Sequence, residues 1–142
     1  MRAFNRYLLM VLSVTALLGC ASKPQPSIYQ ALGEKQGIES ITDSFIKQIA
    51  KDEAIFPYFA KSSVSHFRQG FITHLCAATG GPCEYEGDSM VDIHTGMNIN
   101  EADFNRVVEL LIIALEENDV DYPTQNRLLK MLAPMRPQVM GI

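Results

Sequence analysis

The segment Met90-Val91-Asp92-Ile93-His94-Thr95-Gly96 decides how the rest of this chain is interpreted. Met90, Ile93 and Met97 are apolar at roughly helical spacing, which predicts that they share one face with His94. An imidazole in such an apolar stripe is either a core side chain with a satisfied hydrogen bond or a ligand of a metal ion. The segment alone leaves both interpretations open, and the remainder of the chain has to decide between them.

The first 19 of the 142 residues have the features of a secretory signal and are excluded from the fold. Arginines at positions 2 and 6 precede a mostly apolar run, residues 7–18, which is short for a membrane-spanning helix. The run ends in Leu17-Leu18-Gly19-Cys20, which resembles a bacterial lipobox and predicts cleavage before Cys20 and lipidation of its thiol. The alternatives are an ordinary signal peptide or an uncleaved anchor. By the same resemblance to a lipobox, Ala21 after the cysteine implies the outer rather than the inner membrane, so we expect this exported protein at the periplasmic face of the outer membrane.

After the signal, residues 20–27 comprise the lipidated cysteine and a Pro-rich polar tether, and residues 28–142 form one domain. The chain has 12 Lys and Arg residues, two of them in the signal, against 16 Asp and Glu residues, so the mature net charge is ten minus sixteen, or −6. An acidic body without a basic cluster argues against nucleic-acid binding.

Cys76 and Cys83 remain once Cys20 is assigned to lipid. They bracket Ala77-Ala78-Thr79-Gly80-Gly81-Pro82, a turn that can bring the two thiols together, and an exported location permits a disulfide. The alternative is two free cysteines, one of them buried on a helix. We expect the disulfide.

Apolar spacing and cap residues predict five or six helices and no strand. The first expected helix is capped by Ser27 and ends at Leu32, and the second runs from about Ile38 to Lys51 after a turn that contains Gly33 and Gly37. The third is capped by Ser63 or Ser65 and is ended by Gly80-Gly81-Pro82. A short helix from Asp88 carries His94, the next is capped by Asn100, and the last has Pro123 near its start. Pro134 and Pro137 should kink or fray the end of the last helix.

An ordered series of motifs along residues 28–138 resembles the group I truncated haemoglobins, small globins with a two-over-two helical sandwich. The series is Ile28-Tyr29, Leu32-Gly33, Phe45, Phe56-Pro57-Tyr58-Phe59, Gly80-Gly81-Pro82, Tyr85, Gly87, Met90, His94, Gly96, Ile99, Asp103-Phe104 and Leu132-Ala133-Pro134. The resemblance implies an all-α fold around haem b, with His94 as the proximal ligand of the iron. The pocket residues that it implies are Phe45, Ile46, Phe59, Phe67, Phe71, His74, Leu75, Met90, Ile93, Val108 and Leu111.

The distal side of the pocket departs from the family pattern. Group I members commonly carry a tyrosine where this chain has Ile46, and often a glutamine where it has Phe71. The hydrogen bonds that stabilise bound oxygen are therefore missing, and oxygen release should be faster unless another group replaces them.

His74 is the candidate replacement. It is a core histidine bonded to a backbone carbonyl, a polar group at the pocket wall, or a sixth ligand of the iron. His66, Lys61 and Arg68 are either surface residues or partners of the haem propionates.

The resemblance implies reversible binding of a diatomic gas, O2, NO or CO, with an unknown reductase maintaining ferrous iron and the membrane reached through lipid on Cys20. One alternative is an enzyme that converts nitric oxide to nitrate, which the missing tyrosine and glutamine disfavour. Another is a haem-free structural lipoprotein that would purify colourless.

Overall fold

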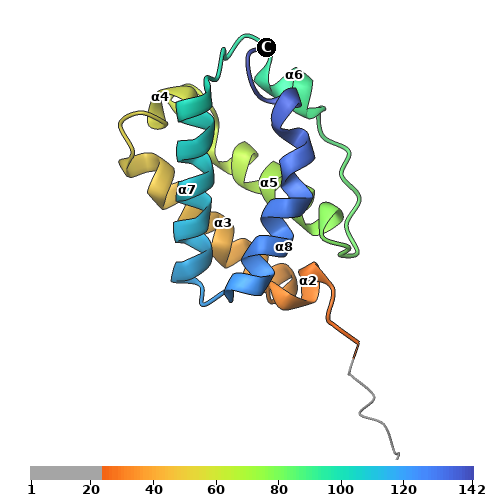
Figure 1. Ribbon diagram of the computed structural model, residues 1–142. Coiled ribbons are helices and arrows are strands. Elements are labelled where there is room, and N and C mark those ends of the chain that lie inside the picture. The colour runs from red at the N-terminus through yellow and green to blue at the C-terminus, as the bar shows by residue number, and fades with distance from the viewer. Residues whose placement is uncertain (1–23) are drawn as a thin grey trace, which may run out of the picture.

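A computed structural model describes residues 24–142, and within this range all regular structure is helical (Figure 1). The elements are α2 (Ile28–Ala31), α3 (Glu34–Lys51), α4 (Phe56–Phe59), α5 (Val64–Ala78), α6 (Met90–His94), α7 (Glu101–Glu117), α8 (Tyr122–Leu132) and the 3-10 helix η1 (Ala133–Gln138). The expected signal and Cys20 lie outside the described residues. Between residues 24 and 142, no helix has both the length and the apolar character to cross a membrane.

The long helices form two layers. In Figure 1, α7 and α8 stand in front of α3 and α5, which cross behind them. Helix α3 is the centre of this arrangement, since it packs against both α5 and α7. The short helix α6 packs against η1 at the end of the molecule remote from α2. The prediction of an all-α fold is confirmed for the described residues.

The core is formed mainly by aliphatic side chains from α3, α5, α7 and α8. Its buried members are Leu32, Ile38, Ile41, Phe45, Ile49, Ile55, Ile72, Leu75, Cys76, Leu110, Leu111, Ala114, Leu115 and Leu128. Each fully buried Leu, Ile or Phe side chain contributes about 1.5–3 kcal/mol relative to an exposed one. The buried hydroxyl of Thr42 donates to the carbonyl of Ile38 at 2.8 Å, so it adds no unpaired polar group.

Most helices begin at a side-chain cap. Ser27 forms a capping box with Gln30, and the Ser63 hydroxyl accepts from the amide of His66. Asn100 and Asp121 cap α7 and α8 in the same manner. The caps predicted at Ser27 and Asn100 are confirmed. Of the two caps predicted for α5, Ser63 rather than Ser65 is the one observed.

Two helix boundaries differ from the prediction. Gly37, expected in a turn, lies inside α3. A Cβ at this position would meet the carbonyl oxygen of Leu32 at 1.8 Å, so the glycine serves the close approach of α3 to Leu32 and does not end a helix. Helix α6 begins after Ser89 rather than at Asp88, since the Ser89 hydroxyl accepts from the amide of Asp92. At the other end of the chain, α8 passes into a 3-10 helix at Ala133, in agreement with the disruption expected from two prolines.

Candidate functional site

His94 is the last residue of α6 and is half-buried. Its Nδ1 lies 2.7 Å from the carbonyl oxygen of Met90, one helical turn earlier. A carbonyl only accepts, so Nδ1 carries a proton, and a ring with its one proton at Nδ1 has its lone pair at Nε2. This is the state in which a histidine binds a metal ion, with its second nitrogen oriented by a backbone carbonyl.

The apolar neighbours of His94 are less buried than a core stripe would be. Met90 is half-buried, and Val91 and Ile93 are 44% and 42% exposed. The prediction that Met97 shares the helical face of His94 is wrong, because α6 ends at His94 and the chain turns through Gly96 with φ of +83°. The interpretation of His94 as an ordinary core side chain is not favoured by these surroundings.

The C-terminal segment holds the residues that follow His94. The amides of Gly96 and Asn98 donate to the carbonyl oxygen of Ile142 at 3.0 and 3.4 Å. Arg136 pairs with Glu101 at 2.6 Å on the first turn of α7. The segment that carries His94 is therefore fixed at both of its sides, by η1 and by the last residues of the chain.

Four phenylalanines from three helices form one aromatic cluster. The ring centroids of Phe45 and Phe71 lie 5.2 Å apart, those of Phe67 and Phe71 lie 5.5 Å apart, and those of Phe59 and Phe67 lie 5.0 Å apart. These separations are typical of favourable aromatic pairs. The structure thus brings together four of the predicted pocket residues from α3, α4 and α5, and half-buried Ile46 from α3 carries no polar group.

His74 lies one helical turn after Phe71 on α5. Its Nε2 is buried and has no hydrogen-bond partner among the residues that the structure describes. Its ring meets that of Tyr85 edge-on, with centroids 5.1 Å apart. Burial lowers the pKa of His74, so the imidazole is neutral near pH 7.

Tyr85 connects the two histidine-bearing helices. Its ring packs on His74 of α5, and its hydroxyl donates to the carbonyl of Asp88 at 2.9 Å, immediately before α6. A Cβ at Gly87 would lie 2.6 Å from the Tyr85 ring, so glycine is required for this loop conformation. Sequence reasoning named Tyr85 only as part of a resemblance and gave no signal for its contact with His74.

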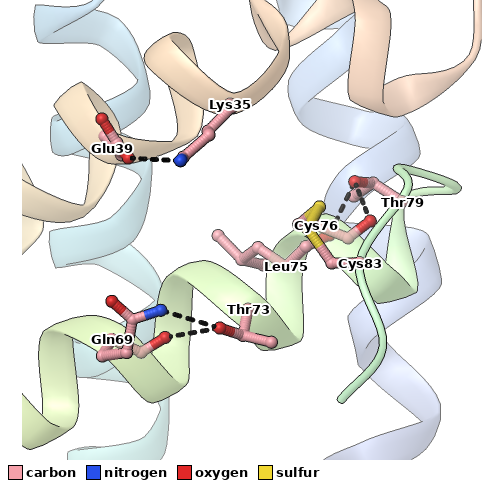
Figure 2. Close-up of a disulfide and its surroundings, with 8 residues drawn as sticks. All are labelled: Lys35, Glu39, Gln69, Thr73, Leu75, Cys76, Thr79 and Cys83. Carbon is pink, nitrogen blue, oxygen red and sulfur yellow. Dashed lines mark hydrogen bonds and ion pairs between the residues drawn. A yellow bond between two sulfur atoms is a disulfide. The ribbon is translucent and has the colours of Figure 1, made fainter.

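A disulfide joins Cys76 of α5 to Cys83 of the loop that follows (Figure 2). Figure 2 also shows the Thr79 hydroxyl turned back towards the end of α5, where it donates to the Leu75 carbonyl at 2.6 Å. The disulfide and this hydrogen bond close the turn that carries the chain towards Tyr85.

The other predicted pocket residues divide into two groups. Leu75 and Leu111 are buried in the core, and Val108 is half-buried on α7. Of the candidates for propionate contacts, Lys61 and His66 are exposed, whereas Arg68 forms two hydrogen bonds with Asp43, at 2.6 and 3.0 Å.

Two contacts that sequence reasoning missed join α7 to the chain around α4. The Tyr58 hydroxyl donates to Asp103 at 2.6 Å, and the guanidinium of Arg106 donates to Asp52 at 2.7 Å. No local pattern marks these pairs, since their partners are 45 and 54 residues apart. They position α4, and with it Phe59 of the aromatic cluster.

The surface hollows beside α2 have no part in this arrangement. Their common lining is Ala31, Asp119 and Val120, at the end of the molecule opposite His94 (Figure 1).

Comparison with known proteins agrees with the helical arrangement. The model of the family described as bacterial-like globin matches residues 27–140. The chain is 28% identical to the group 1 truncated hemoglobin of Tetrahymena pyriformis over 120 residues, covering 84% of this chain and 98% of the relative. It is also 28% identical to the group 1 truncated hemoglobin GlbN of Mycolicibacterium paratuberculosis, covering 82% and 87% of the two chains.

Solved structures give the same result. The crystal structure of the Tetrahymena pyriformis truncated hemoglobin in its Fe(III) form superimposes with a TM-score of 0.79 at 26% identity, covering 82% of this chain and all of that one. The 2/2 hemoglobin of Synechococcus, at 20% identity and a TM-score of 0.76, shows the shared fold alone. The predicted two-over-two fold is therefore confirmed.

Proposed function

Because this chain belongs to the bacterial-like globin family, we propose that it binds a diatomic gas reversibly at a haem iron held by His94. Haem is the cofactor of this family of globins, and gas binding at the haem is its general property. The assignment of His94 and the choice of gas are specific to the proposal.

The residues present fit the cofactor. Haem iron takes four nitrogen donors from the macrocycle and needs one neutral imidazole from the protein. His94 offers that imidazole, and the hydrogen bond from its Nδ1 to the Met90 carbonyl is the observation that carries the proposal. The described residues contain no group of three His, Cys, Asp or Glu side chains that could hold a metal ion without a macrocycle. The phenylalanine cluster supplies apolar surface for a flat apolar group.

The absorption spectrum of the haem-loaded ferrous protein without oxygen tests the proposal. One broad visible band is expected for a five-coordinate iron with an open site. His94→Ala should lose stoichiometric haem or change this spectrum, whereas His66→Ala, which alters an exposed histidine, should not. Normal haem content and an unchanged spectrum in His94→Ala would refute the assignment of the ligand.

Ile46 and Phe71 give bound O2 no stabilisation, so the protein holds O2 tightly only where another side chain of the distal side donates a hydrogen bond to it. Ile46 and Phe71 offer no hydrogen bond, and bound oxygen gains more from one than CO or NO does, because it develops more negative charge. A hydrogen bond to a charged group is worth about 1.5–3 kcal/mol, or roughly ten- to a hundredfold in dissociation rate. Dissociation rates of the three gases measured by rapid mixing would rank them.

We also propose that the mature protein is anchored through a lipid on Cys20 at the periplasmic face of the outer membrane. The lipobox-like sequence supports this location, and so does the disulfide between Cys76 and Cys83, because disulfides persist in oxidising compartments. Labelled palmitate should enter the wild-type protein and the control variant Cys83→Ser but not Cys20→Ser. Incorporation into Cys20→Ser, or none into the wild type, would contradict the anchor.

A further inference from the structure

One face of α5 combines apolar rings with a single histidine. Phe67, Gly70, Phe71 and His74 are spaced by three or four residues, so they lie on the same side of the helix. Phe67 and Phe71 of this face join Phe45 and Phe59 in the aromatic cluster. His74 is therefore the one side chain of these four that can donate a hydrogen bond on the cluster side of α5.

Within residues 24–142, the Nε2 atom of His74 has no hydrogen-bond partner, although it is buried. Buried polar groups are nearly always paired, so an unpaired one in a folded protein requires an explanation. The Tyr85 ring packs against the His74 imidazole edge-on and leaves the two rings without a hydrogen bond. The Tyr85 hydroxyl is already bonded to the Asp88 carbonyl, which holds the ring in place beside the imidazole.

Gly70 leaves open space one helical turn before His74. A helical side chain leans towards the turn before it, so a histidine at position 74 can turn towards position 70. A Cβ built at Gly70 would meet nothing within 4 Å. Glycine in a helix interior lowers stability, and here no close contact requires it. The open space at position 70 gives the imidazole room to turn towards the cluster side of α5.

We propose that His74 is the residue that stabilises a gas ligand in the distal pocket, by donating a hydrogen bond from its Nε2–H to the ligand. This inference rests on the proposed function, since it needs haem held on the other side by His94. The donor is a neutral imidazole with one N–H, and Tyr85 restrains its ring. It takes the role that a tyrosine or a glutamine would have at Ile46 or Phe71. It favours ligands that carry negative charge, O2 above CO.

Two variants of His74 distinguish the effect of its hydrogen-bond donor from the effect of its ring shape. His74→Phe keeps a ring without a donor, and His74→Gln keeps a donor. Oxygen dissociation should be about tenfold faster in His74→Phe, which corresponds to the loss of one ordinary hydrogen bond. The oxygen dissociation rate of His74→Gln should stay within about threefold of the wild-type rate. Gln69→Ala, at an exposed position of the same helix, is the control and should have no effect.

The infrared stretching frequency of bound CO provides a readout independent of rates. This frequency should be higher in His74→Phe than in the wild type, because the positive field of the N–H group is lost. In His74→Gln, whose side-chain amide can still donate, part of the bound CO should keep a frequency below that of His74→Phe. Wild-type values of both the oxygen dissociation rate and the CO frequency in His74→Phe would overturn the proposal. So would two sharp visible bands in the gas-free ferrous wild type that become one broad band in His74→Phe, because His74 would then be an iron ligand.

Haem stoichiometry, measured first, distinguishes failure of this inference from failure of the proposed function. A wild-type chain that takes up no haem overturns both. A chain that binds haem through His94 but shows no effect of His74→Phe overturns only the role of His74. Equal haem content and equal helical circular dichroism in the variants show that differences in rate arise in the pocket.

Discussion

The Nε atom of Arg106 lies 2.7 Å from Oδ2 of Asp52, and this pair ties α7 to the chain just before α4. The other carboxylate oxygen of Asp52 accepts from the amides of Ala54 and Ile55, at 3.1 and 3.0 Å. One side chain thus joins a local turn to a helix that is 54 residues away in sequence. Phe59 of the aromatic cluster depends on the placement of this turn.

The hydrogen bond from Arg106 lowers the pKa of Asp52 below its ordinary value of 3.8. A carboxylate with a lowered pKa stabilises the folded state fully above its unfolded pKa and loses that effect as the pH falls through the lowered value. Asp52→Asn keeps an acceptor for the two amides but removes the charge. It should unfold at a lower urea concentration than the wild type near pH 7, and the difference should shrink as the pH falls below the ordinary carboxyl pKa and through the lowered pKa of Asp52. A difference independent of pH would contradict the role of the charge.

The disulfide should stabilise the haem-free fold measurably. Its two cysteines are seven residues apart, and closing so short a loop is worth about 2–3 kcal/mol in the chain-entropy model. Urea unfolding of the wild type with and without reductant should differ by this amount. The double variant Cys76→Ala with Cys83→Ala should be insensitive to reductant, and any remaining effect in it would come from another source.

Two helical glycines should respond to alanine in opposite directions. Gly70→Ala should stabilise the haem-free chain by about 0.5–1 kcal/mol, because a Cβ meets nothing there and helix propensity rises. Gly37→Ala should destabilise it by about 3 kcal/mol, because its Cβ would lie 1.8 Å from the Leu32 carbonyl oxygen. Urea midpoints of the two variants test both signs at once, and equal shifts would be inconsistent with the described backbone.

Imidazole from solution should restore the iron ligand to a His94→Gly variant. The ring of His94 is oriented by a backbone carbonyl, which the substitution leaves in place to hold an added imidazole. Without imidazole the variant should bind haem weakly, and with millimolar imidazole it should regain the single broad ferrous band. His66→Gly should not respond. A native spectrum of His94→Gly in the absence of imidazole would place the ligand elsewhere.

Local features of the fold could be predicted from the sequence. The spacing of Ile38, Ile41, Phe45 and Ile49 identified α3, because an amphipathic helix repeats its apolar face every three to four residues. Cap residues identified where several helices begin, because a cap bonds to a backbone amide only two or three positions away and is therefore visible in the local sequence. Gly37 was misplaced because its close approach to the Leu32 carbonyl depends on how α2 meets α3.

The candidate site was less accessible to such reasoning. His94 was singled out by an ordered series of motifs, and its apolar surroundings alone left two interpretations open. The contact between His74 and Tyr85 depends on a loop whose path is set by a disulfide and by a required glycine at position 87. Met97 was assigned to the wrong face because the left-handed turn at Gly96 ends the helical repeat.

The position of α2 has a consequence for how an anchored molecule stands on its membrane. Helix α2 is held to the end of α5 by the bond from the Tyr29 amide to the Thr79 carbonyl, and it lies at the opposite end of the molecule from α6 (Figure 1). A tether of residues 20–27 reaches at most about 25 Å. With the anchor proposed at Cys20, the tether keeps α2 within about 25 Å of the attachment point, and the end with His94 is the farther of the two ends from it. An electron donor dissolved in the aqueous space would then reach the end with His94 without approaching the lipid.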